Sequence, residues 1–240
     1  MAMANFDPYY AKISNPAPSS YDWRNYNKVC EVKDQVSCGS CWAFETIGNL
    51  EAQFASRVGG CKKFSEQMLI DCDTSDSGCN GGLMECAFAY LKKSGVLCFA
   101  DGYTPYKGIK GNCGTYTHEV DMKVTGYKKL GSSYSTWSPV DEGEIKEFLY
   151  QTGPLAIVLN AAPLQTYSSG ILDLPSTECP SSEIIHAVLL VQYGTDWYSR
   201  LLDCENSWGK SWWESGYFKI RGGKGTCGVN CYITTATVSF

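Results

Sequence analysis

Residues 35–44 read Gln-Val-Ser-Cys-Gly-Ser-Cys-Trp-Ala-Phe, and this stretch decides how the rest of the chain is interpreted. From Trp42 to Val58, apolar residues such as Leu50 and Phe54 recur three or four positions apart, which is the spacing of one helix face. Cys41 therefore comes at the start of a predicted helix, where unpaired backbone N–H groups and the helix dipole favour an anion. We expect a thiol at that position to have a lowered pKa and to be a strong nucleophile.

A thiolate needs a general base and an oxyanion site before it can cleave an acyl bond, and the chain has two histidines. His118 lies in a polar loop, where we expect an ordinary loop histidine. His186 precedes the apolar stretch 187–191, and a polar side chain at the start of an apolar strand suggests a functional role. Twenty residues later, Asn206 carries an amide that can hold an imidazole in one orientation, with Trp208 shielding that hydrogen bond from water.

The composition excludes several classes of protein. A chain of 240 residues predicts one domain or two closely joined ones. The sequence is 44% hydrophobic and 19% charged, which indicates a folded chain. Lys and Arg number 20 against 25 Asp and Glu, so there is no basic surplus for nucleic acid. No run approaches the roughly 20 apolar residues of a membrane span, so we expect no membrane partner.

Thirteen cysteines indicate an oxidising compartment and several disulfides. Because the number is odd, at least one thiol stays unpaired or pairs with another chain. The first residues, 1–4, look like a start codon followed by a vector scar, and no apolar signal segment follows them. We therefore expect residues 1–16 to be a tail that combines this scar with a possible pro-segment remnant.

The hydrophobic periodicity changes along the chain. Helices are predicted over 42–58, 64–70, 83–91 and 142–150, and strands over 120–124, 154–160, 186–193 and 217–220. Gly59 and Gly95 are expected to end the first and third helices. A helical half thus precedes a strand-rich half, with a seam near Gly126. This order predicts an α+β protein in two lobes.

With these residues assembled, the chain resembles the papain-like cysteine proteases, and within them the cathepsin L branch. Residues 38–42, Cys-Gly-Ser-Cys-Trp, match the nucleophile signature of that family, and His186 follows Cys41 by 145 residues. Further similar blocks are Asp-Trp-Arg at 22–24, Ser-Glu-Gln at 65–67, Asp-Cys at 71–72, Gly-Cys-Asn-Gly-Gly at 78–82 and Asn-Ser-Trp-Gly at 206–209. The resemblance runs from about Ser20 to the C-terminus.

The resemblance implies a two-lobed fold for a peptidase domain of residues 17–240. It implies a helical first lobe over about 26–127 and a β-barrel-like second lobe over about 128–235. The two termini would cross between the lobes, and the active-site cleft would lie between them.

The family also implies roles for matching residues. Cys41 would attack the peptide carbonyl as a thiolate, and His186 would pair with it and then protonate the leaving amine. Asn206 would orient His186. The Gln35 side-chain amide and the Cys41 backbone N–H would form the oxyanion hole.

The resemblance further implies how a substrate binds. Gly81 and Gly82 would pair with an extended substrate backbone. The pocket for the second residue before the scissile bond (P2) would be lined by Leu83, Met84, Val158, Ile184 and Ala187, with Tyr232 near its floor and Trp208 also at the binding site. Because this lining is apolar, Leu, Phe or Val is expected at P2 in preference to Arg. No His-bearing insertion resembles the cleft-capping loop of dipeptide-releasing relatives, so the expected activity is that of an endopeptidase.

Four residues depart from the family pattern. Val36 stands where Gly usually follows the oxyanion Gln, and Ile185 stands where Asp or Asn is common before the His. Glu205 replaces a common Lys, and Trp213 replaces a Gly. None of these changes removes a catalytic group, although Val36 and Trp213 are bulky.

The family implies the disulfides Cys38–Cys79, Cys72–Cys113 and Cys179–Cys227, with Cys41 free. Six cysteines remain, which allow fifteen connectivities. Their positions along the chain favour Cys86–Cys98 and Cys204–Cys231, and elimination leaves Cys30–Cys61. If all twelve pair, the denatured and unreduced protein has one thiol.

The same residues allow other interpretations. Cys38 and Cys41 could form a redox pair, but a thioredoxin-like context is missing, and a zinc site is disfavoured because Cys227 and Cys231 have the wrong spacing. The alternative function is an inactive relative that acts as a binding protein, although the chain keeps all four catalytic groups.

The resemblance implies neither a metal nor an organic cofactor. It implies peptide and protein substrates, cystatin-type inhibitors and the chain's own pro-segment as partners, with the protein a monomer. The acidic pI and the cysteines predict a lysosomal or vacuolar, or else a secreted, location.

Overall fold

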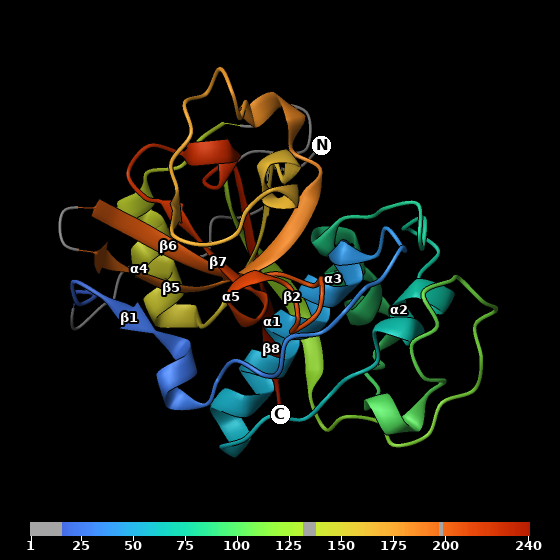
Figure 1. Cartoon of the computed structure of the whole chain (residues 1–240). Helices are drawn as coiled ribbons and strands as arrows, with labels where there is room; N and C mark the ends of the chain where they lie inside the picture. Colours follow the sequence, from blue (N-terminus) through green and yellow to red (C-terminus); the bar gives the residue numbers. More distant parts are fainter. Residues whose placement is uncertain (1–15, 132–137, 197–198) are drawn as a thin grey trace, which may run out of the picture.

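The computed structural model describes residues 16–131, 138–196 and 199–240, and in them helices dominate the first half and strands the second (Figure 1). The helices are α1 (Cys41–Val58), α2 (Glu66–Cys72), α3 (Met84–Ser94), α4 (Glu142–Thr152) and the short α5 (Trp213–Gly216). The strands are β1 (Tyr21–Asp22), β2 (Lys123–Gly131), β3 (Leu155–Leu159), β4 (Ile171–Leu172), β5 (His186–Asp196), β6 (Ser199–Glu205), β7 (Tyr217–Arg221) and β8 (Tyr232–Ser239). Single 3₁₀ turns are η2 (Trp23–Tyr26), η3 (Ala100–Gly102), η4 (Ala162–Gln165), η5 (Ser181–Glu183) and η6 (Thr226–Gly228). The α+β class is therefore confirmed.

The helix boundaries follow from local chemistry. Gly59 adopts φ +84° and its N–H donates to the Ala55 carbonyl, which ends α1 in a left-handed cap. Gly95 ends α3 in the same way, at φ +70°. At the start of α2, the Ser65 hydroxyl accepts a hydrogen bond from the Met68 N–H. The predicted ends at the two glycines are confirmed.

The strands form one sheet in the order β2-β8-β3-β5-β6-β7-β4, and β1 pairs with β5. Its outermost strands, β2 and β4, do not pair with each other among the described residues, so the sheet is open. The two-lobed fold with a strand-rich second lobe is confirmed, although its sheet is not closed; the edge strand β4 has two residues and pairs in parallel with β7.

The sheet separates two hydrophobic cores, because successive side chains on a strand point to opposite faces. On β3, Ala156 and Val158 join a core with α1, α2 and α3, whereas Leu155 and Ile157 join a core with α4. The predicted seam near Gly126 falls inside β2. There the pairing of β2 with β8 shifts register between Val124 and Gly126, and strand pairing continues on both sides of this irregularity.

The structure contains the disulfides Cys30–Cys61, Cys38–Cys79, Cys72–Cys113 and Cys179–Cys227. Five cysteines are free: Cys41, Cys86, Cys98, Cys204 and Cys231. The predicted pairs Cys86–Cys98 and Cys204–Cys231 are therefore wrong.

Topology explains both errors. Cys204 lies on β6, whereas Cys231 precedes β8, and the strands β3 and β5 lie between β8 and β6 in the sheet. Cys98 is buried, and its thiol donates to the Thr117 carbonyl at 3.0 Å instead of facing α3, which carries Cys86. The number of residues between two cysteines along the chain did not show how far apart they lie in the fold.

Among the described residues, no helix is both long and apolar enough to cross a bilayer.

Candidate active site

A groove of about 410 Å³ opens where the start of α1 meets the start of β5. Cys41 lies in its wall together with Ile185 and Ala187, the two neighbours of His186. The remaining lining residues are Ser75, Asp76, Ser77, Asn80, Gly81, Gly82, Leu83, Val158 and Ile184. The two lobes thus contribute facing walls, one from the α1 and 75–83 segments and one from β3 and β5.

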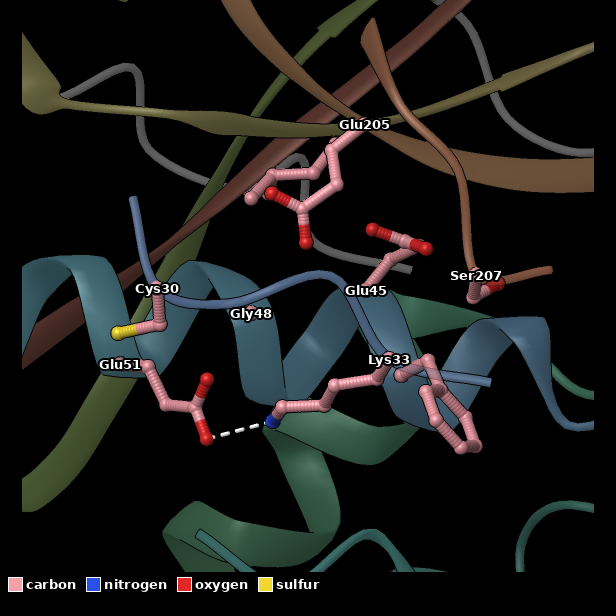
Figure 2. Close-up of a pocket in the computed structure, with 9 residues that line it drawn as sticks. Cys30, Lys33, Glu45, Gly48, Glu51, Glu205 and Ser207 are labelled. Atoms are coloured by element: carbon pink, nitrogen blue, oxygen red, sulfur yellow. Dashed lines mark hydrogen bonds and ion pairs between the residues drawn. The ribbon is translucent and has the colours of Figure 1, made fainter. Parts of the chain in front are cut away.

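A much smaller cavity of about 10 Å³ lies beside α1 (Figure 2). Lys33 forms an ion pair with Glu51 across 2.6 Å and a second one with Glu66. Glu45 and Glu205 also line this cavity. The described residues contain no cluster of three or more His, Cys, Asp or Glu arranged to hold a metal ion.

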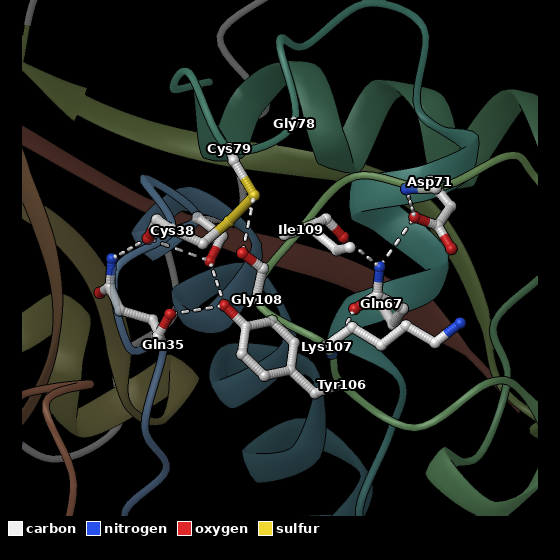
Figure 3. The surroundings of a disulfide bond; sticks show 12 residues. Gln35, Cys38, Gln67, Asp71, Gly78, Cys79, Tyr106, Lys107, Gly108 and Ile109 are labelled. Atoms are coloured by element: carbon white, nitrogen blue, oxygen red, sulfur yellow. Dashed lines mark hydrogen bonds between the residues drawn. A yellow bond between two sulfur atoms is a disulfide. The ribbon is translucent and has the colours of Figure 1, made fainter.

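The Cys38–Cys79 disulfide holds the loop that carries the nucleophile candidate (Figure 3). Beside it, the Gly39 N–H donates to the Cys79 carbonyl at 2.9 Å. A Cβ at position 39 would lie 2.6 Å from that same carbonyl oxygen, so only glycine allows the two segments to approach this closely. The Cys-Gly-Ser-Cys spacing therefore fixes Cys41 at the first position of α1.

Cys41 itself is half-buried, and the thiol receives backbone N–H groups from Ala187 and from Trp42. Burial raises the pKa of the Cys41 thiol, and these N–H groups oppose the rise only in part. The lowered thiol pKa expected from the helix start is therefore opposed in this groove, because burial outweighs the local dipoles.

His186 is buried at the start of β5, and its Nε2 lies 2.8 Å from Asn206 Oδ1. The Ser207 backbone N–H also donates to this Asn206 atom, at 2.9 Å, which identifies it as the oxygen. Nε2 must therefore carry the proton of the neutral ring, and Nδ1 keeps its lone pair. Burial lowers the pKa of His186 to about 4, although the hydrogen bond to Asn206 opposes this shift.

Trp208 covers the ring of His186, with the ring centroids 5.0 Å apart. An aromatic ring at this distance excludes water from one face of the imidazole. The position agrees with the shielding expected from the sequence. Trp208 is not among the residues that line the groove, so its contact is with His186.

Gln35 is held on all sides by hydrogen bonds (Figure 3). Its backbone N–H donates to the Ser207 carbonyl at 2.8 Å, and its carbonyl accepts from the Tyr106 hydroxyl at 2.7 Å. Its side-chain Nε2 donates to the Cys38 carbonyl at 2.8 Å, and Oε1 accepts from the Ser207 hydroxyl at 2.6 Å. One hydrogen of the Gln35 amide has no partner among these contacts, although Gln35 is buried and is not among the residues that line the groove.

No role was predicted for Ser207, yet this residue contacts both Gln35 and Asn206. Its position inside the 206–209 block was the signal that could have revealed it.

Most residues expected at the substrate site lie together. Gly81, Gly82, Leu83, Val158, Ile184 and Ala187 all line the groove. Met84 and Tyr232 are instead fully buried in the first core, so their side chains lie behind the groove wall and not on its surface. Met84 is the first residue of α3, which turns its side chain inward.

The match to a known family identifies the fold. The profile described as "Papain family cysteine protease" matches residues 17–237. The chain belongs to the papain family of cysteine proteases.

Members of this family from distant organisms are similar over nearly the whole chain. A viral cathepsin of Spodoptera litura multicapsid nucleopolyhedrovirus is 38% identical over 233 residues, which cover 94% of this chain and 66% of that protein. Cathepsin F of Drosophila melanogaster is 38% identical over 228 residues, which cover 92% of this chain and 36% of that protein. The chain thus spans about two thirds or less of the length of these curated relatives.

A solved structure shares the fold. The digestive procathepsin L2 from the Tenebrio molitor larval midgut is 35% identical, with a TM-score of 0.84. The match covers 93% of this chain and 69% of that one.

Of the four departures from the papain-family pattern, Ile185 lines the groove, Glu205 lines the small cavity, and Val36 and Trp213 lie on the surface. Val36, Ile185 and Trp213 are 60%, 75% and 52% exposed, respectively. Val36 adopts φ +45°, in the left-handed region where glycine is favoured, which explains why glycine is usual at this position. Glu205 lines the small cavity, and its carboxylate accepts a hydrogen bond from the Tyr217 hydroxyl at 3.0 Å.

Proposed function

We propose that this chain is a cysteine endopeptidase in which residues 17–240 form the peptidase domain. The observation that carries the proposal is the arrangement of His186, whose Nε2–H is taken up by Asn206 so that Nδ1 remains the basic nitrogen. Cys41 shares the groove with the two neighbours of His186 and accepts the N–H of one of them, Ala187. This arrangement supports the assignment of Cys41 as nucleophile, His186 as base and Asn206 as the orienting amide.

In the proposed mechanism, the Cys41 thiol transfers its proton to Nδ1 of His186 as the sulfur attacks the peptide carbonyl. The carbonyl π electrons move to oxygen, and this oxyanion is stabilised by the Cys41 backbone N–H and by the free hydrogen of the Gln35 amide. When the C–N bond breaks, His186 gives its proton to the leaving amine, and a thioester remains. Water then attacks the thioester with His186 as general base, which releases the carboxylic acid and restores the thiol.

Burial makes each isolated charge costly, since it raises the pKa of Cys41 and lowers that of His186. Proton transfer within the pair creates both charges side by side, and their attraction in a poorly solvated groove opposes the desolvation cost. We therefore propose that the thiolate–imidazolium pair forms at the moment of substrate attack.

The apolar part of the groove supports the proposed substrate preference. Leu83, Val158, Ile184 and Ala187 present aliphatic side chains, so a substrate with Leu, Phe or Val at P2 would bury apolar surface there. An Arg at P2 would lose hydration without a carboxylate from these four residues to pair with. Faster cleavage of an Arg-Arg than of a Phe-Arg fluorogenic peptide would contradict this preference.

The proposed partners are peptide and protein substrates, the chain's own pro-segment and cystatin-type inhibitors. Each would bind in the groove, and the enzyme is proposed to be a monomer. The structural relatives include proforms by their printed names, and this supports the proposal of a pro-segment. A lysosomal, vacuolar or secreted location is proposed from the four disulfides and the cathepsin-named relatives.

The proposed function is tested by alkylating the native enzyme with iodoacetamide and mapping the label by mass spectrometry. We expect Cys41 to react first, in step with loss of peptidase activity, and a competing peptide substrate to slow the reaction. Cys86 is the other free thiol that is only half-buried, so a Cys86→Ser variant serves as the control and should behave like the parent. Full labelling of Cys41 with peptidase activity retained would contradict the proposal, whereas an unlabelled parent without peptidase activity would favour an inactive, peptide-binding relative.

A further inference from the structure

The hydroxyl group of Tyr106 contacts the loop of residues 35–40 at two points, and the mechanism above gives this hydroxyl no role. It lies 2.7 Å from the Gln35 carbonyl oxygen (Figure 3). It also lies 3.0 Å from the hydroxyl of Ser40. Gln35 carries one of the proposed oxyanion donors, and Ser40 directly precedes Cys41, whose backbone N–H is the other. Tyr106 therefore bridges the two residues on which the spacing of these donors depends.

The direction of both hydrogen bonds follows from the groups involved. A carbonyl oxygen only accepts, so the single proton of the Tyr106 hydroxyl goes to Gln35. The same hydroxyl then has no proton left for Ser40, and Ser40 Oγ must donate to the phenol oxygen. The donors thus run in one order, from Ser40 to Tyr106 to Gln35, and neighbouring bonds in such a chain polarise one another.

Burial makes the contact between Ser40 and Tyr106 costly to lose. Ser40 is fully buried, and its other acceptor, the Cys38 carbonyl, lies at 3.5 Å, which is long for a hydrogen bond from a hydroxyl. That carbonyl already accepts the Ser40 N–H and the Gln35 side-chain amide, both at 2.8 Å. The Ser40 hydroxyl therefore depends on Tyr106 as its acceptor.

Tyr106 is itself held from two sides. Its ring meets the Phe44 ring edge to face, with the centroids 4.9 Å apart, which places it against the first turn of α1. The next residue, Lys107, donates its N–H to Gln67 Oε1 at 2.8 Å, and Gln67 Nε2 donates to the Ile109 carbonyl at 2.9 Å (Figure 3). Since Gln67 is a buried residue of α2, the Tyr106 hydroxyl is supported by two helices.

We propose that Tyr106 is a positioning residue that fixes the spacing between the two oxyanion donors, the Gln35 side-chain amide and the Cys41 backbone N–H. This inference rests on the proposed function, because it assigns these two groups to the oxyanion. Gln35 is 6% exposed, so the direction of its free N–H depends on where the loop of residues 35–40 holds its backbone. Because an oxyanion donor must lie about 2.7–3.1 Å from the developing charge, a small change in spacing would weaken one of the two bonds.

The surroundings of Tyr106 keep its hydroxyl protonated at neutral pH. Burial raises the pKa of this phenol, and the carboxyl groups of Glu66 and Asp34 add to the rise. The hydrogen bond with Ser40 opposes the rise, as expected of a bond that the phenol oxygen accepts. The proton that Gln35 receives is therefore present wherever the enzyme works near neutral pH.

The test compares Tyr106→Phe, which removes the hydroxyl and keeps the ring, with Tyr103→Phe as a matched control. Tyr103 belongs to the same segment of the chain and also has a hydrogen-bonded hydroxyl. This hydroxyl donates to Asp71 at 3.2 Å and accepts the Gly114 N–H at 2.9 Å, instead of contacting the loop of residues 35–40. Both variants thus lose a hydroxyl with two partners, and only Tyr106→Phe releases the oxyanion donors.

Two readouts separate the positioning of the oxyanion donors from a general disturbance of the site. The first is the affinity for a peptide aldehyde, because its hemithioacetal oxygen would occupy the oxyanion site. The second is the rate of iodoacetamide alkylation of Cys41, which does not use that site. We expect Tyr106→Phe to lower kcat and aldehyde affinity about tenfold, less than the loss of a whole oxyanion donor, with KM and the alkylation rate within about twofold of the parent. Tyr103→Phe should change none of these four values.

Further variants test whether Tyr106 acts through the two donors. In a Gln35→Ala background one donor is absent and there is no spacing left to fix, so adding Tyr106→Phe should lower aldehyde affinity no further. Ser40→Ala removes one of the two hydrogen bonds of the Tyr106 hydroxyl, so it should lower aldehyde affinity about threefold and leave the alkylation rate unchanged.

Unchanged aldehyde affinity in Tyr106→Phe, an equal loss in the alkylation rate, or the same tenfold loss in the Gln35→Ala background would overturn the inference. If Tyr106→Phe does not fold, Ser40→Ala decides the question, and unchanged aldehyde affinity in that variant would overturn the inference. A parent enzyme that neither cleaves peptides nor is labelled at Cys41 would instead refute the proposed function.

Discussion

Asn206 Oδ1 lies 2.8 Å from His186 Nε2, and because the same oxygen also accepts the Ser207 N–H, the contact determines the tautomer of the imidazole. The basic nitrogen of neutral His186 is therefore Nδ1. Together with the burial of both His186 and Cys41, this arrangement allows the pH dependence of the reaction to be worked out.

We expect a bell-shaped pH profile of kcat/KM with a broad plateau. The active pair holds one proton, whether on sulfur or on nitrogen, so activity is lost when a second proton binds or the only one leaves. Because burial lowers the pKa of His186 to about 4, the acid limb should lie near pH 4 and not near the usual histidine value of about 6.5. Because burial raises the pKa of Cys41, the alkaline limb should lie above the ordinary thiol value of about 8.5. A rate that rises continuously from pH 5 to pH 9 would contradict this account, since it describes an unactivated thiol.

The strained backbone at Val36 predicts a stabilising substitution. Val36 is a β-branched residue at φ +45°, and its side chain is largely exposed, so little packing is lost on its removal. Val36→Gly should raise the free energy of unfolding by about 1 kcal/mol, since relief of strain is partly offset by the added flexibility of the unfolded chain. Urea unfolding measures the change. Val36→Ala should raise the free energy of unfolding by less. A loss of stability in Val36→Gly would show that the backbone at position 36 is unstrained.

The carboxyl of Glu205 predicts a pH-dependent stability. Burial raises its pKa to about 7, so the folded state binds a proton more tightly than the unfolded state does. The free energy of unfolding should therefore fall as the pH rises from about 4.5, the unfolded value, to about 7, by up to roughly 1.4 kcal/mol for each unit of the shift. Glu205→Gln cannot ionise but keeps an acceptor for Tyr217, so its stability should fall less over this range. Equal slopes in thermal unfolding of parent and variant at pH 5 and pH 7.5 would contradict the prediction.

The thiol count follows from the disulfides in the structure. The denatured and unreduced protein should show five thiols, and Cys86→Ser should show four. In the native protein only Cys41 and Cys86 should react at an appreciable rate, because Cys98, Cys204 and Cys231 are buried. A count of one thiol would instead support the disulfides Cys86–Cys98 and Cys204–Cys231, which the structure does not contain.

The sequence predicted the helices and the nucleophile loop well, and the sheet less completely. Helix α1 was predictable because its apolar residues recur every three to four positions and Gly59 follows the last of them. Strand β6 was missed because four consecutive residues, 201–204, are buried, which leaves no alternation to detect. Strand β8 was missed for the same reason, since it lies between two neighbouring strands. Strand order and the pairing of the extra cysteines depend on contacts between distant segments, which local patterns do not contain.

At the site, the residue types were predictable and the hydrogen bonds between them were not. The distances of Asn206 and Gln35 from Ser207 depend on how the two lobes meet.

The most direct test of the central claim is hydrolysis of a Phe-Arg fluorogenic peptide by the parent and by Cys41→Ala, each shown to be folded by thermal unfolding. We predict that Cys41→Ala lowers kcat/KM by about a thousandfold or more, and that adding His186→Ala causes little further loss, because the two residues act as a unit. A Cys41→Ala variant that keeps its activity within tenfold of the parent would contradict the assignment of Cys41 as the nucleophile.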